Sequence, residues 1–266
     1  MKEISLQVAA EAGAQKLNIL REYLQNEVLF LMQKTGFSDS LYFVGGTALR
    51  FLYKIRRFSE YLDFSAGDKW QSKDLEAHAA KLQKELIKAG YEVDLPVKDE
   101  KTGQRVFLRF KGLPYEAGLS GRKGQNLSVH IEIDANPPAG WHEERTIVNI
   151  HMPVLIRHYD KPSAFASKLA AFLTRPYTKG RDLYDLFWLR SKWKELRPNF
   201  ELLNNALAQK MKTLRPVDET NWLETIATMA AKLNWEAVVG DARPFLEDPR
   251  EVATLTKENF SLLYNA

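Results

Sequence analysis

The residues best suited to chemistry begin with two glycines, Gly45 and Gly46, which follow a short apolar run and precede a threonine. Tyr42–Val44 reads as a strand, and the glycines after it let the backbone turn sharply and approach a ligand closely. We expect Thr47 to cap the helix that follows. A strand, a glycine turn and a helix N-terminus together present free N–H groups, which is a site suited to phosphate.

An acid follows on the next predicted strand. Residues Tyr61–Ser65 alternate so that Tyr61 and Asp63 share one face, whereas Leu62 and Phe64 share the other. A phosphate-friendly turn therefore lies next in sequence to a strand that carries a carboxylate. This layout is typical of a metal-dependent nucleotide site.

A further strand is predicted at Leu127–Asp134, where His130, Glu132 and Asp134 share one face. These acids are candidates for further hard oxygen ligands of a divalent metal. The alternative is that Glu132 and Asp134 lie on the solvated face of a half-exposed strand.

Basic residues gather in a predicted helical region. Lys161, Lys168 and Arg175 recur every seven residues, which places them near one helix face. The segment Lys179–Asp182 then begins the next helix, where an acid suits the first turn. The alternative to a binding role is a solvated basic face with local charge partners.

The hydrophobic pattern predicts an α+β half followed by a helical half. We expect domains at 1–158 and 159–266, with a boundary uncertain by about 4 residues. The predicted helices are 17–34, the helix that Thr47 caps with Leu49, Leu52 and Tyr53 on one face, 71–88, 162–173, 180–192, 199–212, 217–233 and 249–264. The predicted strands are 42–44, 61–65, 91–97, 105–110, 127–134 and 146–151, with hairpin loops at 99–103 and 118–126.

Composition is ordinary for a globular protein, with 266 residues, 45% hydrophobic and 27% charged. The absence of cysteine excludes disulfides and thiolate metal sites. The net charge of +4 mildly favours an anionic partner. No apolar run approaches the roughly 20 residues of a membrane span, and Met1–Ile4 lacks a signal-peptide pattern, so we expect a cytoplasmic protein and no membrane partner.

The segments Val44–Leu49 and Arg57–Phe64 resemble the nucleotidyltransferase toxins of the AbiEii/MenT type, within the DNA polymerase β-like superfamily. The resemblance implies a nucleotidyltransferase-like mixed sheet with flanking helices. In that family the second segment reads Arg-x-Ser-x-Asp-x-Asp. Asp63 holds the position of the second acid, whereas Tyr61 holds that of the first.

The resemblance also implies the residue roles. The catalytic set would be Asp63, Glu132, Lys168 and the position of Tyr61, and the metal, Mg²⁺ or Mn²⁺, would be held by Asp63 and Glu132 with Asp134 in reserve. Nucleoside triphosphate (NTP) would be bound by Gly45, Gly46, Thr47, Arg57, Ser59, Lys168 and Arg181, with Asp182 and Asp185 orienting the cations or lying near the metal.

Tyr61 leaves two interpretations open. A phenol with a pKa near 10 is a poor ligand for Mg²⁺, so the residue either impairs one metal position or is replaced in that role by Glu60. By strand alternation Glu60 should lie on the opposite face, which disfavours the replacement.

The family implies a toxin of a bacterial toxin–antitoxin system. Such a protein would transfer a nucleotide from an NTP to an RNA acceptor, with the 3′ end of tRNA as one example, and would have a cognate antitoxin. Arg56 and Arg57, as well as hairpin residues such as Arg105 and Arg109, are candidates for phosphate or RNA contacts, or else simple linker charges. The rival hypothesis is a catalytically silent nucleotide- or RNA-binding protein that keeps the fold.

Overall fold

The computed structural model describes residues 1–100, 103–177, 179–211 and 215–264. It divides into two compact units. The first comprises 1–53, 58–137 and 145–158, and the second comprises 54–57, 138–144 and 159–266. The division into two folding domains at residue 158 stays a prediction.

The first unit is built on a mixed sheet with the strand order β3-β5-β6-β2-β1-β8-β7, and β4 pairs with β5 beside this path. Its two central strands, β2 and β6, run parallel, whereas β1–β2 and β5–β6 are antiparallel. The strands are β1 (Leu41–Val44), β2 (Tyr61–Ala66), β3 (Val93–Asp94), β4 (Val97–Glu100), β5 (Gly103–Lys111), β6 (Asn126–Asp134), β7 (Glu143–Asn149) and β8 (Pro153–Tyr159). This sheet with its flanking helices confirms the predicted α+β class.

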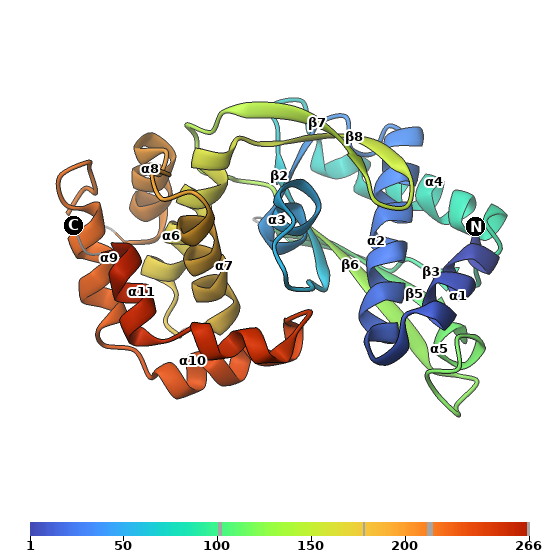
Figure 1. Cartoon of the computed structure of the whole chain (residues 1–266). Helices are drawn as coiled ribbons and strands as arrows, with labels where there is room; N and C mark the ends of the chain where they lie inside the picture. Colours follow the sequence, from blue (N-terminus) through green and yellow to red (C-terminus); the bar gives the residue numbers. More distant parts are fainter. Residues whose placement is uncertain (101–102, 178, 212–214, 265–266) are drawn as a thin grey trace. The chain divides into compact units, whose positions relative to one another are not determined.

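One face of the sheet is apolar and packs against helices α2 (Lys16–Lys34) and α4 (Leu75–Lys88), both labelled in Figure 1. Leu62 and Phe64 of β2 are buried in this core together with Ile131 of β6. The predicted alternation of β2 is therefore confirmed, and it leaves Tyr61 and Asp63 on the face opposite the core. Helices α1 (Lys2–Glu11), α3 (Gly45–Tyr53) and α5 (Leu113–Glu116) complete the unit.

Helix α2 buries polar side chains that hold nearby loops. Gln25 donates a hydrogen bond to the carbonyl of Ser59 at 3.0 Å, and the side-chain oxygen of Asn26 accepts from the backbone N–H of Met152 at 2.7 Å. Glu22 forms a buried ion pair with Arg50 of α3. Buried polar groups need such partners, and here they fix the approach to β2.

The second unit is helical. Its helices are α6 (Lys161–Thr174), α7 (Gly180–Lys192), α8 (Phe200–Lys210), α9 (Trp222–Ala230), α10 (Trp235–Ala242) and α11 (Lys257–Tyr264). Asp160 caps α6 by accepting from the N–H of Ser163. Gly180 lets α7 meet α10, since a Cβ there would collide with the backbone carbonyl of Val238. The 3₁₀ turns of the chain are Gly13–Gln15, Ser72–Asp74, Arg243–Phe245 and Pro249–Thr254.

Several predicted bounds were wrong. Strand 91–97 is interrupted at Leu95–Pro96, because proline has no N–H to give to a ladder, and only β3 and the first residue of β4 lie within it. Strand 146–151 is β7, which ends at Asn149, and β8 was not predicted. Helix 217–233 shortens to α9, α10 was missed, and 249–264 is a 3₁₀ turn followed by α11. Residues 101–102 of the predicted loop and residue 212 of the predicted helix lie outside the described residues.

None of the helices in the described part of the chain is both long enough and apolar enough to cross a membrane.

Candidate active site

Two carboxylates stand side by side at the centre of the sheet. Asp63 on β2 and Glu132 on β6 are direct register partners, and both side chains are half-buried on the face opposite the core. Adjacent strands lie about 4.8 Å apart, which lets the two carboxylates approach one ligand. Asp134 pairs with Ser65 one step further along the same face, is exposed, and accepts from the N–H of Asn136.

The glycine turn lies against the first of these carboxylates. Val44 at the end of β1 pairs with Asp63, and α3 begins at the next residue, Gly45. Gly45 has φ of +77°, and a Cβ there would collide with Oδ2 of Asp63. The glycine is therefore required twice, by its left-handed backbone and by the carboxylate beside it. The positive end of α3 favours the negative charge of Asp63 and of any bound anion.

Thr47 does not have its predicted role as a helix cap. Because α3 starts at Gly45, Thr47 is the third residue of the helix rather than the residue before it. Its side chain is fully buried, and its hydroxyl donates to the backbone carbonyl of Tyr61. Thr47 thus joins α3 to the start of β2, and its part in nucleotide binding stays a prediction.

Tyr61 belongs to an aromatic group on the same face as the acids. It pairs in register with His130, with ring centroids 5.1 Å apart, and His130 also meets Phe107 at 5.0 Å. Burial lowers the pKa of His130 below its usual value, although Glu132 acts in the opposite direction, so the imidazole is neutral at pH 7.

Glu60 lies just before β2, so strand alternation does not place it, and that part of the sequence argument was wrong. Its carboxylate is 4.0 Å from the guanidinium of Arg21 on α2. It lines a cavity with Tyr61, which brings it nearer to that side chain than alternation predicts.

Basic side chains share the face of the carboxylates on the neighbouring strand. Arg105 pairs in register with Glu132 and lies 3.1 Å from its carboxylate. Arg109 and Lys111 follow at the same alternation on β5. The sequence could not show that these residues are co-facial, and the pleat of β5 makes them so.

The acids present fit one divalent ion rather than a pair of ions. Among the described residues there is no group of three histidine, aspartate or glutamate side chains arranged to hold a metal. Asp63 and Glu132 supply two hard oxygen donors, and Mg²⁺ commonly accepts one or two carboxylates together with water and substrate phosphate. Tyr61 lies two residues before Asp63 on the same face of β2, and its place as the first acid of the family pattern stays a prediction.

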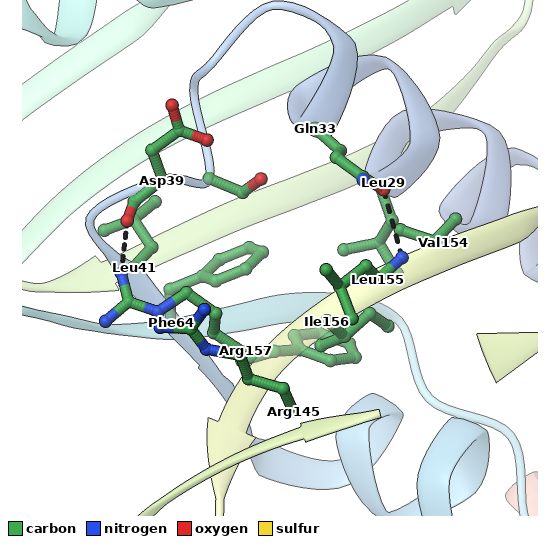
Figure 2. Close-up of a pocket in the computed structure, with 12 residues that line it drawn as sticks. Leu29, Gln33, Asp39, Leu41, Phe64, Arg145, Val154, Leu155, Ile156 and Arg157 are labelled. Carbon is green, nitrogen blue, oxygen red and sulfur yellow. Dashed lines mark hydrogen bonds between the residues drawn. The ribbon is translucent and has the colours of Figure 1, made fainter. Parts of the chain in front are cut away.

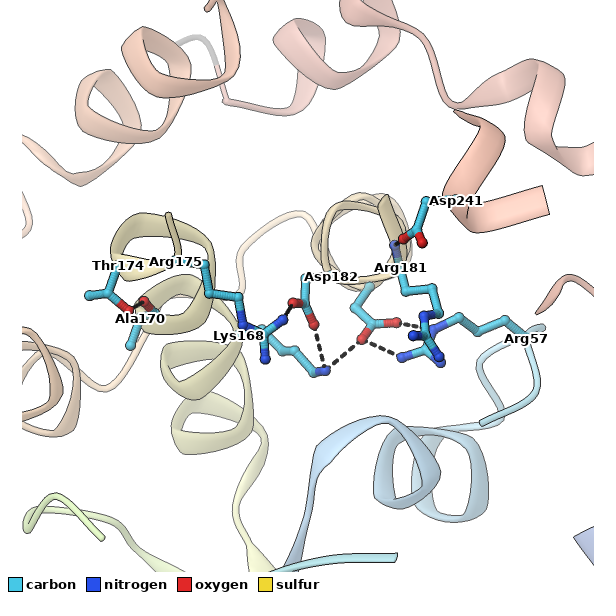
Figure 3. Close-up of polar contacts among 9 residues, drawn as sticks. Arg57, Lys168, Ala170, Thr174, Arg175, Arg181, Asp182 and Asp241 are labelled. Atoms are coloured by element: carbon cyan, nitrogen blue, oxygen red, sulfur yellow. Dashed lines mark hydrogen bonds and ion pairs between the residues drawn. The ribbon is translucent and has the colours of Figure 1, made fainter. Parts of the chain in front are cut away.

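Lys168 and Arg57, two of the predicted phosphate-binding cations, lie in a buried ion-pair network of the second unit (Figure 3). Lys168 on α6 contacts Asp185 at 2.8 Å and Asp182 at 3.1 Å, both on α7. Arg57 makes two hydrogen bonds of 2.6 Å to the carboxylate of Asp185, and Arg175 pairs with Asp182. The two aspartates therefore orient cations, as the sequence argument proposed for one of its alternatives.

The network favours the charged forms of Lys168 and Asp182. Burial alone would lower the pKa of Lys168, but Asp185 and Asp182 raise it above its ordinary value. Burial would likewise raise the pKa of Asp182, whereas Lys168 and Arg175 bring it below the usual range. Each charge is thus compensated by a direct partner, which a buried ion requires.

Arg57 is 2% exposed, and its buried guanidinium donates to Asp185 instead of facing solvent, where a ligand could reach it. Arg181 lies outside the network, with its guanidinium 4.0 Å above the ring of Phe245 and its backbone N–H facing Asp241. Arg56 pairs with Glu247 and Glu251, which matches the reading of a linker charge. The nucleotide-binding roles of Arg57, Ser59 and Arg181 stay predictions.

Two of the cavities among the described residues are lined by the first unit. One, of about 350 Å³, is lined by Tyr61 and His130 together with Arg21 of α2. The other, of about 280 Å³, lies between the end of α2 and strands β1 and β8, where Gln33 accepts from the N–H of Leu155 and Arg157 donates to the carbonyl of Asp39 (Figure 2). Neither the contact of Arg21 with Glu60 nor the pairing of Arg175 with Asp182 was predicted from the sequence. The seven-residue spacing of Lys161, Lys168 and Arg175 was the sequence signal that could have indicated the second pair.

The comparison with protein families decides the identity of the chain. Residues 27–258 match the family described as nucleotidyl transferase AbiEii toxin, type IV toxin–antitoxin system. The chain belongs to this family. The AbiEii match confirms the resemblance drawn from Val44–Leu49 and Arg57–Phe64, and the family is one of nucleotidyltransferase toxins with an antitoxin partner.

Solved structures share the AbiEii fold at low sequence identity. The crystal structure of JHP933 from Helicobacter pylori is 19% identical, with 92% of this chain and 90% of that chain covered and a TM-score of 0.55. A candidate nucleotidyltransferase from H. pylori is 20% identical, with 91% and 94% covered and a TM-score of 0.54. No curated protein sequence matches the chain.

Proposed function

We propose that this AbiEii-family protein transfers a nucleotide from an NTP to an RNA hydroxyl, with Asp63 and Glu132 as the metal-holding pair. The observation that carries the proposal is their register pairing directly beside the glycine turn at Gly45. Carboxylates next to a helix N-terminus combine a cation site with an anion site, which is what a metal–triphosphate complex needs.

A divalent ion bound there would neutralise the charge that develops on the triphosphate during transfer. Asp63 and Glu132 would hold it, with Asp134 in reserve on the adjoining register pair. Arg105, 3.1 Å from Glu132, restrains the rotation of that carboxylate in the apo protein. Tyr61 contributes no carboxylate, and we propose that this residue weakens transfer.

The triphosphate would be bound by backbone N–H groups of Gly45 and Gly46 at the start of α3. Lys168 and Arg181 would be further cations for the triphosphate, as the family resemblance implies. Asp182 and Asp185 hold the ammonium group of Lys168 in place.

Three basic residues on one face of β5, Arg105, Arg109 and Lys111, support an RNA acceptor, because a row of cations can contact successive phosphates of an RNA backbone. The 3′ end of tRNA is one such acceptor. We propose a cytoplasmic site of action, where RNA and NTP are both available.

A second candidate function is a catalytically silent nucleotide- or RNA-binding protein. Tyr61 is the observation that favours it, since an aromatic ring packed on His130 stands where the family pattern has an acid. Under this alternative NTP would bind but no nucleotide would be transferred.

Replacing Tyr61 by aspartate separates the two candidates. Labelled NTP is incubated with total RNA and Mg²⁺ or Mn²⁺, and incorporation is compared between the parent, Tyr61→Asp and the control Tyr61→Phe. Loss of one electrostatic group commonly costs about 100–1,000-fold in rate, so Tyr61→Asp should gain transfer on that scale. The variant should also become toxic in cells that lack its antitoxin.

Tyr61→Phe removes only the hydroxyl and should transfer as little as the parent. A double variant, Tyr61→Asp with Asp63→Asn, should lose the gain. A parent protein already as active as Tyr61→Asp would show that Tyr61 does not impair the site. Absence of transfer by Tyr61→Asp, with NTP still bound, would favour the silent protein.

A further inference from the structure

The cavity of about 350 Å³ beside Tyr61 is lined only by residues of the first unit, among them the neighbours of the two carboxylates along β2 and β6. Tyr61 and His130 are each two residues before Asp63 and Glu132 on their strands. At about 3.3 Å per residue, the cavity wall begins about 7 Å from the carboxylate pair. A ligand placed there would therefore have one end within reach of the reacting groups.

One wall of the cavity is aromatic. The rings of Tyr61 and His130 meet edge to face at an interplanar angle of 68°, and Phe107 supports the histidine from the other side at 69°. Rings held by neighbours on both sides lose little freedom when a planar ligand stacks on them. Nucleobases are such ligands, and stacking on aromatic side chains binds all four of them.

The opposite wall carries a buried donor without a partner. Nε of Arg21 is buried and makes no hydrogen bond within the described residues. Its Nη1 lies 4.0 Å from the carboxylate of Glu60. Burial lowers the pKa of Arg21 although Glu60 opposes this, and a guanidinium normally keeps its charge. An unused buried donor is costly, so an acceptor from a ligand would be favourable here.

The charge of the cavity favours the neutral part of a nucleotide. Arg21 and Glu60 offset one another, and the remaining polar lining comes from neutral groups of Gln125, Asn126 and Ser128. A phosphate would meet the carboxylate of Glu60, whereas a base and ribose offer both donors and acceptors. The volume lies at the lower end of the range for small-molecule sites, which suits one nucleoside.

We propose that this cavity is a nucleoside pocket, in which the rings of Tyr61 and His130 hold a base and Arg21 donates to it. The inference rests on the proposed function for its biological meaning. The nucleoside is either that of the donor NTP or the terminal nucleoside of the RNA acceptor. Tyr61 then acts as a positioning residue for the ligand, in addition to displacing a metal ligand.

The test fills the pocket and measures binding rather than transfer. Ser128→Trp places a large ring in the cavity, and Leu155→Trp places the same ring in the other cavity as a matched control. Calorimetry is run with the four nucleosides, the four NTPs, inorganic triphosphate and an RNA oligonucleotide. Thermal unfolding checks that each variant is folded, and Arg21→Gln with His130→Ala provides a second route that adds no bulk.

We expect Ser128→Trp to abolish nucleoside binding, and the loss of one stacking ring in His130→Ala to weaken it about tenfold or more. Leu155→Trp should bind nucleosides like the parent. The affinity for inorganic triphosphate should be unchanged in all of these variants. A fall in NTP affinity alone assigns the pocket to the donor, and a fall in oligonucleotide affinity alone assigns it to the acceptor. Nucleoside binding that survives both Ser128→Trp and the Arg21→Gln, His130→Ala variant overturns the pocket.

The proposed function fails differently. If Tyr61→Asp transfers no nucleotide while nucleosides still bind and Ser128→Trp still blocks them, the pocket stands and the transfer reaction does not. The two proposals also meet in one measurement. Tyr61→Asp should raise kcat but lose the ring, so KM for the ligand that uses the pocket should rise, whereas a merely structural tyrosine would leave KM unchanged.

Discussion

Asp185 should contribute more to stability than any other acid of its network. Its side chain is fully buried, it accepts two hydrogen bonds of 2.6 Å from Arg57, and Lys168 lies 2.8 Å from its second oxygen. Asp185→Ala would remove the carboxylate that pairs with Arg57, and Lys168 would keep Asp182. Removing one member of a buried pair costs about 3–5 kcal/mol, because the remaining charge stays desolvated.

Lys168→Met is the informative comparison. After that change Asp185 keeps Arg57 and Asp182 keeps Arg175, so no carboxylate is left without a cation. Methionine also fills most of the volume of the lysine stem. We therefore expect a much smaller loss than for Asp185→Ala, and a double variant less destabilised than the sum of the two single variants, because one of the stranded cations is gone.

Urea unfolding followed by circular dichroism measures these differences. For Asp185→Ala, at about 2–4 °C per kcal/mol, the thermal midpoint should also fall by roughly 6–20 °C. Glu219→Ala, which removes an exposed pair with Arg197, is the control and should change little. An Asp185→Ala protein as stable as the parent, or a double variant whose loss equals the sum, would refute the reasoning.

Three further predictions concern the site and the core. Gly45→Ala should displace the carboxylate of Asp63 and abolish Mn²⁺ binding, measured by electron paramagnetic resonance, whereas Gly121→Ala, in open space, should not; unchanged affinity in the first would contradict the placement of Asp63. Arg181→Ala should weaken NTP binding by about 10–100-fold in calorimetry and leave nucleoside binding intact, since only the phosphates lose a partner; equal losses for both ligands would argue against a phosphate contact. Burial raises the pKa of Glu27 above 4.5, so the folded protein keeps a proton that the unfolded chain has lost, and stability should decline as pH rises from about 4.5. Glu27→Gln should make the unfolding midpoint depend less steeply on pH. An equal dependence on pH in the variant and the parent would disprove this role of Glu27.

The sequence predicted the parts of the site that depend on local pattern. Alternation in Tyr61–Ser65 fixed which residues face the core, because a strand has only two faces. Alternation could not say which strands are neighbours. The register of Asp63 against Glu132 is a long-range pairing, and the Arg105 contact follows from a third strand, so both required the structure.

The helix caps were the weaker part of the prediction. Threonine is a residue type that often caps helices, but α3 begins two residues before Thr47, at Gly45. Gly45 has a positive φ, and the contact with Asp63 leaves no room for a side chain there. Asn234 accepts from the N–H of Ala237 and caps α10, a signal present in the sequence but not used. The partner of Arg57 was harder still, because Arg57 and Asp185 are 128 positions apart.

The four residues 54–57 belong to the second unit although 58–137 belong to the first. Arg57 pairs in a single β-bridge with Leu246, and the carbonyl of Arg56 accepts from the N–H of Glu247. During synthesis these residues leave the ribosome about 100–200 positions before their partners at Asp185 and Leu246. The second unit therefore cannot reach its final packing until most of the chain has been made.

A fragment beginning at residue 159 would keep Lys168 but lack Arg57, one of the two counter-ions of Asp185, so cutting the chain at this boundary would yield a weakened piece. Adding the segment 54–57 as a separate peptide would be the natural way to restore such a fragment.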